Sequence, residues 1–146
     1  MNSRRMQPLL DRAKEREDRL ARELAEQQRR QAEQEGRLEE LRRYAEEYAQ
    51  AGQGTVAPAL LANRYAFVAR IDHAITQQRQ NVDRSRERVD IERARLMMAS
   101  RDAKVMEKLA ASYRADEARE VEKRLQREMD DLAARGVRLR REGDAS

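Results

Sequence analysis

Apolar residues recur every seven positions through the second half of the chain, and this repeat limits the possible fold more than any other feature. The residues that stand seven apart are Leu61, Val68, Ile75, Val82, Val89, Leu96, Ala103 and Ala110. A companion set of seam positions holds Ile71, Gln78, Ser85, Glu92, Ala99, Met106 and Tyr113. Such a repeat places one narrow apolar stripe along an α-helix and is typical of a coiled coil. It predicts a long helix over about residues 58–142.

The first half of the chain carries a similar stripe with a polar middle. Its apolar members alternate at spacings of three and four: Met6, Leu10, Ala13, Leu20, Leu24, Leu38, Leu41, Ala45 and Tyr48. In the same frame, polar residues stand at Glu17, Gln27, Gln31 and Gln34, and Gly36 follows. We interpret this segment as a polar layer that specifies the pairing register, the alternative being a point where the helix bends. The stripe predicts a helix over about residues 6–51.

A short glycine-containing segment, about residues 52–57, separates the two stripes. Gly52 suits the end of a helix because glycine adopts positive φ at little cost. Thr55 is a candidate N-cap, and Pro58 is tolerated in the first turn of the following helix. These features predict an all-α fold, an elongated antiparallel two-helix coiled-coil hairpin that forms a single domain over residues 1–146.

The composition agrees with a coiled coil and disfavours a globular domain. Charged residues make up 41% of the chain, aromatic residues 3%, and there is no Trp, which leaves little material for a compact core. Disorder is the competing interpretation of so charged a chain, but the regular apolar spacing argues against it. The net charge of +4 comes from interleaved acidic and basic residues, a pattern typical of solvated helix faces and not of nucleic-acid binding.

Several classes of protein are disfavoured by what the sequence contains. It has no cysteine for a disulfide, and no apolar run long enough to span a membrane. The basic residues near the N-terminus are not followed by the apolar core of a secretory signal, so we expect a cytoplasmic location. His73, the single histidine, falls at an outward heptad position, and the carboxylates lack metal-ligand spacing. We therefore expect no enzyme activity, cofactor, metal site or small-molecule substrate.

The second predicted helix is far longer than the first, so it should overhang. In the two registers that we consider, Met6 reaches either Ala103 or Ala110, which leaves residues from about 111 onward without a partner. The stripe of this segment is offset by four residues after Tyr113, a stutter in the repeat. An exposed apolar stripe indicates an interaction site, with a frayed terminus as the alternative. The expected partner-binding residues of the overhang are Val121, Leu125, Leu132 and Leu139.

Four of the five aromatic residues, Tyr44, Tyr48, Tyr65 and Phe67, lie close to the predicted loop. Tyr44, Phe67 and Ala74 occupy positions that flank the seam, where coiled coils usually carry Glu or Lys. Tyr and Phe are effective interface anchors, so we predict a partner-binding surface here instead of a mere cap over the hairpin end. Its predicted members are Leu41, Tyr44, Tyr48, Phe67, Ile71 and Ala74.

Three groups of residues resemble the FliJ family, whose members are small cytoplasmic components of the flagellar type III export apparatus. They are Met6-x-Pro8-Leu9-Leu10-x-x-Ala13, Leu41-x-x-Tyr44-x-x-x-Tyr48 and Phe67-x-x-x-Ile71-x-x-Ala74. The resemblance implies an antiparallel coiled coil similar to the gamma-subunit stalk of rotary ATP synthases. It further implies a place at the periphery of the inner membrane, where the export apparatus lies.

The resemblance also implies partners, namely the export ATPase FliI, its regulator FliH, the export gate protein FlhA and substrate-specific chaperones. The six predicted residues near the loop match the family's gate-binding patch, whereas Gln78 stands where the family often has a polar ring side chain. The implied function is mechanical coupling of ATPase to gate, the end with both termini entering the ATPase ring. We expect a monomer or weak self-association. The alternatives are a scaffold that pairs residues 118–139 between chains, or a nucleic-acid-binding protein that uses its arginines.

Overall fold

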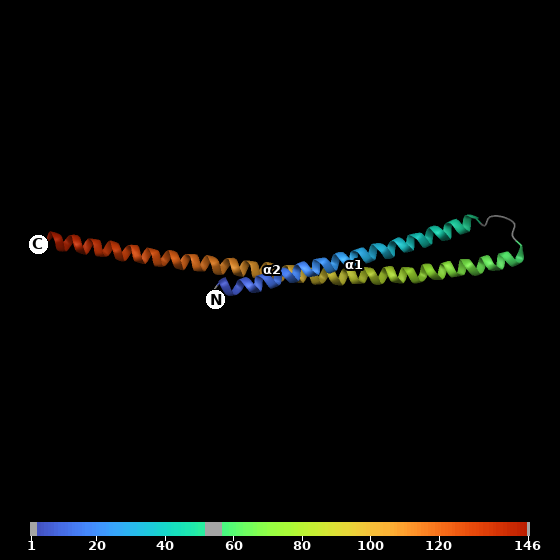
Figure 1. The fold of residues 1–146 in the computed structure, drawn as a ribbon, viewed down its shortest axis with the longest axis horizontal. Coiled ribbons are helices and arrows are strands. Elements are labelled where there is room, and N and C mark those ends of the chain that lie inside the picture. Colours follow the sequence, from blue (N-terminus) through green and yellow to red (C-terminus); the bar gives the residue numbers. More distant parts are fainter. Residues whose placement is uncertain (1–2, 52–56, 146) are drawn as a thin grey trace. The chain divides into compact units, whose positions relative to one another are not determined.

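The computed structural model describes residues 3–51 and 57–145, and these form two α-helices. Helix α1 runs Ser3–Ala51 and helix α2 runs Pro58–Asp144 (Figure 1). The two helices pack against each other, so the chain is an all-α two-helix hairpin, as the two apolar stripes predicted. For comparison, the stripes placed the helices at about 6–51 and 58–142. No helix in the described ranges is long and apolar enough to cross a membrane.

Helix α2 begins at a proline for a local reason. The carbonyl of Ala57 accepts a hydrogen bond of 2.9 Å from the Leu61 N–H, so Ala57 starts the helical hydrogen-bond pattern and Pro58 follows as the first helical residue. Proline fits this position because its missing N–H has no intrahelical acceptor there. The predicted helix-ending Gly52 and the predicted cap Thr55 lie outside the described residues.

The packing divides the chain into two compact units, which we call the terminal unit and the middle unit. The terminal unit comprises Met1–Glu15 with Ser100–Ser146, and the middle unit comprises Arg16–Ala99. The terminal unit has a small apolar core of Met6, Leu10 and Ala110, against which Met106 and Tyr113 pack. Since Met6 meets Ala110, the helices of this unit pair in the further of the two registers that we considered.

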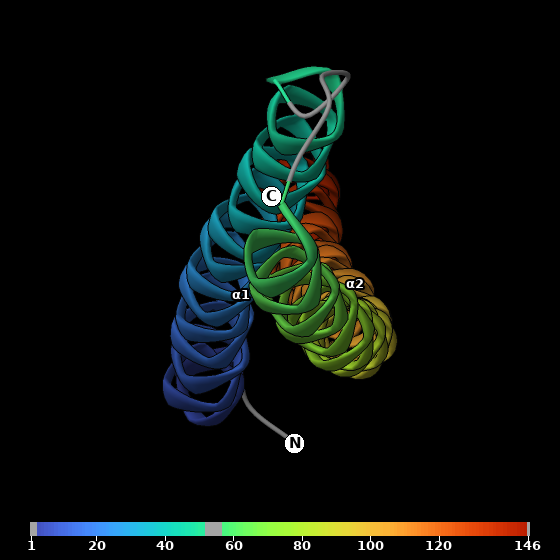
Figure 2. The ribbon, with the colours of Figure 1, turned by 90° about the vertical axis from the view of Figure 1, so that its right-hand side faces the viewer.

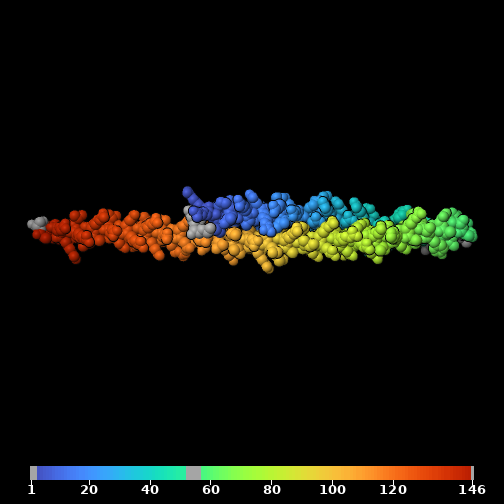
Figure 3. Space-filling model, turned by 90° about the horizontal axis from the view of Figure 1, so that it is seen from below, coloured from blue at the N-terminus to red at the C-terminus, as the bar shows by residue number. Residues whose placement is uncertain are grey.

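Ser3 and Glu117 mark where helix pairing ends in the terminal unit. The Ser3 backbone N–H and hydroxyl donate hydrogen bonds of 2.7 Å to the two carboxylate oxygens of Glu117. Beyond Glu117, every described residue is exposed, from 118 to 145. Figure 3 shows this orange-to-red segment with no other segment covering the visible face. The predicted overhang of the second helix is therefore present within this unit.

The middle unit buries the predicted seam, but with polar residues among the apolar ones. Its buried apolar side chains are Leu20, Leu38, Ile71, Val82, Val89 and Ala99, and its buried polar side chains are Gln78 and Ser85. Gln78 Nε2 donates hydrogen bonds of 2.8 Å to both the backbone oxygen and Oε1 of Gln34. Helix α1 continues without a break through Gly36, so the glutamines act as a polar layer between the helices.

Two seam predictions at the start of α2 are wrong. Leu61 and Val68 are 41% and 37% exposed, whereas Phe67 is half-buried and Ile71 is buried. The reason is steric: the large Phe67 ring packs on Tyr48, with a centroid distance of 4.6 Å, and so turns the flanking face of α2 toward α1. Figure 2 is viewed from the side where α1 ends and α2 begins, and it shows the green first turns of α2 beside α1.

Candidate partner-binding surfaces

Three aromatic rings meet where the end of α1 lies against the start of α2. The Phe67 ring stacks at a tilt of 47° on Tyr48 and meets Tyr44 edge-on, with a centroid distance of 6.0 Å and an interplanar angle of 69°. Such offset and edge-to-face arrangements are the favourable geometries for aromatic pairs. The structure thus brings together three of the residues that the sequence predicted for a partner-binding surface.

We call the six predicted residues, Leu41, Tyr44, Tyr48, Phe67, Ile71 and Ala74, the aromatic strip. Its members differ in exposure: Ile71 is 7% exposed and belongs to the seam, whereas Tyr44 is 50% exposed. A groove of about 440 Å³ opens beside Tyr44, and Arg37, Glu40, Leu41 and Gln78 line it as well. The strip is therefore anchored in the helix interface and open to solvent along Tyr44.

Arg64 holds the two helices together near the strip, and the sequence analysis missed it. Its guanidinium lies over the Tyr48 ring, 5.4 Å from the centroid, a cation–π contact. Its Nη2 donates hydrogen bonds to the backbone oxygens of Tyr48 and Ala49, at 3.1 and 3.4 Å. These carbonyls belong to the last turns of α1, where a positive charge is favourable. The available signal was that Arg64 is the only charged residue between positions 57 and 69.

Tyr65 is the one ring near the loop that does not join the strip. It is 69% exposed and makes no ring contact among the described residues. The neighbouring side chains of Leu60 and Leu61 are also exposed, at 60% and 41%. Tyr65 resembles Tyr44 in size and exposure but lies apart from the stacked rings, which makes it a useful control residue.

The four predicted residues of the overhang share one face of the uncovered part of α2. Val121, Leu125, Leu132 and Leu139 are between 54% and 69% exposed. Met129, 67% exposed, belongs to the same stripe but does not fit a strict seven-residue repeat. The sequence indicates this place for Met129, because apolar residues also recur eleven positions apart, from Ala118 to Met129 and from Val121 to Leu132. The overhang presents a narrow apolar stripe along α2.

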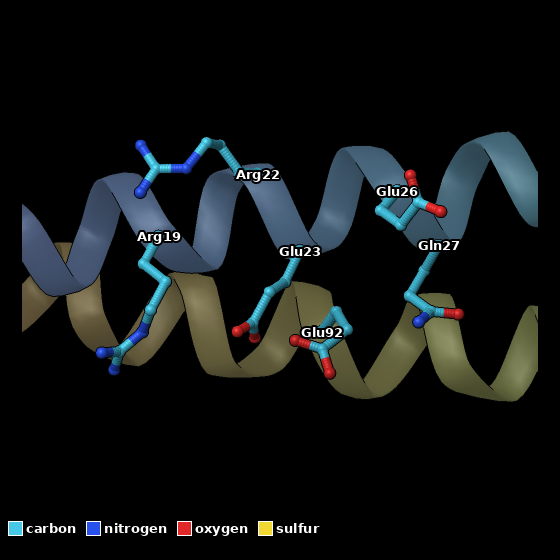
Figure 4. Close-up of a pocket in the computed structure, with 6 residues that line it drawn as sticks. All are labelled: Arg19, Arg22, Glu23, Glu26, Gln27 and Glu92. Carbon is cyan, nitrogen blue, oxygen red and sulfur yellow. The ribbon is translucent and has the colours of Figure 1, made fainter.

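A groove of about 300 Å³ in the middle unit has mixed charge. Arg19, Arg22, Glu23, Glu26, Gln27 and Glu92 line it (Figure 4). Arg95 Nη1 donates a hydrogen bond of 3.3 Å to Oε1 of Glu92. The other carboxylate oxygen of Glu92, Oε2, is buried and has no hydrogen-bond partner among the described residues. No group of three or more His, Cys, Asp or Glu side chains in the described ranges is arranged to hold a metal ion.

Local hydrogen bonds lower the pKa of two partly exposed carboxylates, Glu117 and Glu26. The Ser3 backbone N–H, and then its hydroxyl, lower the pKa of Glu117 by stabilising its charged form. Arg29 lowers the pKa of Glu26 through its hydrogen bond and its positive charge. His73 lies exposed on α2, at its predicted outward position.

Comparison with known proteins gives one match. The sequence model of a family described as "Flagellar FliJ protein" matches residues 1–142 of the 146. No curated protein and no solved structure matches the chain. The matched range includes both helices through the overhang, all six residues of the aromatic strip, and the four predicted residues of the overhang.

Proposed function

Because the chain belongs to the FliJ family, whose members are non-catalytic components of the flagellar type III export apparatus, we propose that it couples the export ATPase to the export gate. In this role it contacts the ATPase FliI and its regulator FliH through one surface and the gate protein FlhA through another. It also acts as a general export chaperone that contacts the substrate-specific chaperones.

The two candidate surfaces support coupling because both use the same uninterrupted helix. Helix α2 is continuous over Pro58–Asp144 and contributes half of the aromatic strip as well as the whole overhang. A continuous helix transmits a displacement along its axis, since its backbone hydrogen bonds link each turn to the next. One surface for each partner is the minimum that a coupling protein needs.

The aromatic strip is our candidate for the gate-binding surface. The observation that carries this assignment is the half-exposed Tyr44, packed edge-on against Phe67 and bordering a groove. Aromatic side chains held rigidly by their neighbours bury a large area on binding and lose little rotamer entropy. The position of these rings in the sequence agrees with the gate-binding patch that the resemblance to the family implies.

Tyr44→Ala tests the gate assignment with Tyr65→Ala as a matched control. Tyr44→Ala should weaken binding to FlhA by about tenfold or more, because it removes a central anchor of the surface. Tyr65→Ala removes an equally large exposed ring outside the strip and should change binding by less than about twofold. Isothermal titration calorimetry with purified FlhA cytoplasmic region and its linker measures both, and circular dichroism confirms helicity. Normal binding by Tyr44→Ala would show that the strip is not the gate surface.

The overhang is our candidate for the ATPase-binding surface. Its stripe has no partner among the described residues, and a coiled-coil partner or a ring lumen would bury it. Replacing Leu125 and Leu132 by Ser should abolish the effect of the chain on FliI ATPase rate while helicity is retained. Met98→Ser, at a residue of similar exposure (64%) in the middle unit, should leave that effect unchanged.

The same exposed stripe also favours a second function, self-association as a scaffold. In that case the overhangs of two chains would cover each other. Sedimentation equilibrium over a range of concentrations separates the two functions, because a scaffold forms dimers that the Leu125 and Leu132 substitutions disrupt. A monomer at all concentrations would exclude the scaffold.

A further inference from the structure

Arginines gather on one flank of the middle unit without an acidic side chain among them. They line a groove of about 340 Å³, together with Gln27, Gln34, Asn81 and Ser85. Helix α1 contributes Arg30 and Arg37, two turns apart, and helix α2 contributes Arg84 and Arg88, one turn apart. Elsewhere in this chain acidic and basic residues are interleaved, so the groove departs from the general charge pattern.

Three of these four arginines have no partner in the described parts of the chain. Arg30 pairs with Glu26 at 3.3 Å, but Arg37, Arg84 and Arg88 form no ion pair or hydrogen bond there. The opposite flank differs, because a cross-helix ion pair of 3.3 Å joins Arg86 on α2 to a glutamate of α1, Glu35. Within the described residues, no ion pair between the helices compensates the arginines of the groove.

The uncompensated charge works against the helix that carries it. Arg84 and Arg88 stand at i and i+4, a spacing at which like charges destabilise a helix. Arg30, Arg37 and Arg88 also occupy the flanking heptad positions, which in other coiled coils form ion pairs between helices. An anion in the groove would relieve this repulsion and form charge-assisted hydrogen bonds.

We propose that this arginine groove binds an acidic peptide segment of a partner protein. Guanidinium groups pair with carboxylates through two parallel hydrogen bonds, and an acidic helix presents carboxylates at the same one-turn spacing as Arg84 and Arg88. Nucleic acid fits less well, because no aromatic side chain lines the groove for base stacking. The proposal rests on charge and geometry alone and does not depend on which protein binds the aromatic strip.

A peptide-binding assay on the full chain tests the proposal. The probe is a fluorescein-labelled helical peptide of about 20 residues with Glu at every fourth position, compared with the same peptide carrying Gln. The test variant is Arg84→Gln with Arg88→Gln. Arg37 is left intact because it also lines the groove beside Tyr44, so a negative result stays separate from the gate assignment.

The control variant, Arg42→Gln with Arg93→Gln, loses the same charge outside the groove. Both control arginines are exposed and form no ion pair within the described ranges. At low salt the Glu peptide should bind the wild type and the control alike, and bind the Arg84 and Arg88 variant about tenfold more weakly. The Gln peptide should show no measurable binding.

Four outcomes would overturn the proposal. The first is unchanged binding of the Glu peptide by the Arg84 and Arg88 variant, and the second is equal loss in the control, which would show a general charge effect. The third is tighter binding of a DNA duplex that the same variant abolishes, which would make the groove a nucleic-acid site. The fourth is a lower melting temperature of the variant, since removing i,i+4 repulsion should leave stability equal or higher.

Discussion

The terminal and middle units both bury the heptad seam between the two helices, but they bury different kinds of side chain. In the terminal unit, seam positions hold Met6, Leu10 and Ala110, which are 2–4% exposed and pack with Met106 and Tyr113. In the middle unit, equivalent positions hold Gln78 and Ser85, 8% and 7% exposed. The two units show that heptad spacing decides which face of a helix is buried, while residue type decides how much free energy the buried face contributes to helix pairing. We expect the terminal unit to contribute more to the free energy of unfolding, and the middle unit to specify the register in which the helices pair.

The largest expected effect comes from removing the apolar core of the terminal unit. Leu10→Ala should lower the free energy of unfolding by about 2–4 kcal/mol, because it deletes buried methyl groups and leaves a cavity. Urea unfolding followed by circular dichroism measures the change. Leu132→Ala, at a residue 65% exposed, should stay within about 0.5 kcal/mol of the wild type. Similar losses for both variants would contradict the core assignment.

A smaller effect of opposite sign is expected at Glu92 in the middle unit. Glu92→Leu should raise the free energy of unfolding by about 1–2 kcal/mol, because a buried oxygen without a hydrogen-bond partner is replaced by an apolar group at a seam position. The lost pairing with Arg95, which is 61% exposed, should matter little. Thermal unfolding measures the change, with the exposed Glu87→Leu as control. A loss of stability would mean that the carboxylate contributes to the pairing.

The glutamine layer should respond differently to single and double substitution. Gln78→Leu alone should cost about 1 kcal/mol, since the Gln34 amide loses its partner, whereas Gln34→Leu with Gln78→Leu should recover that loss. A double-mutant cycle in urea measures the coupling. Additive effects would show that the two amides do not act as one layer.

The smallest expected effect concerns pH and the contact between Ser3 and Glu117. Hydrogen bonds from Ser3 lower the pKa of Glu117 in the folded chain below the ordinary value of a glutamate. The contact therefore contributes stability above the unfolded pKa, and that contribution is lost as pH falls through the folded pKa. Glu117→Gln should reduce the difference in melting temperature between about pH 7 and about pH 3. The exposed Glu120→Gln is the control, and an equal reduction there would remove the contact from the explanation.

The sequence predicted much of the candidate site but not its internal arrangement. The flanking positions of Tyr44 and Phe67 were readable because large rings replace the usual charged residues there. The role of Arg64 was not readable from the sequence. It depends on a hydrogen bond to the backbone oxygen of Tyr48 on α1, which lies sixteen positions away along the chain. The exposure of Leu61 and Val68 was also hidden, because heptad spacing ranks all apolar residues alike and ignores the size of a neighbouring ring.

What the sequence by itself determined is the period, and with it the two helices, their apolar faces and the uncovered end of α2. Period is a local property, set by the rotation of about 100° per residue that every α-helix shares. What only the tertiary structure decided is which positions meet: Met6 with Ala110, Gln34 with Gln78, Phe67 with Tyr48, and four arginines around one groove. These depend on the register between the two helices, and register follows from how side-chain volumes and hydrogen bonds fit across the interface.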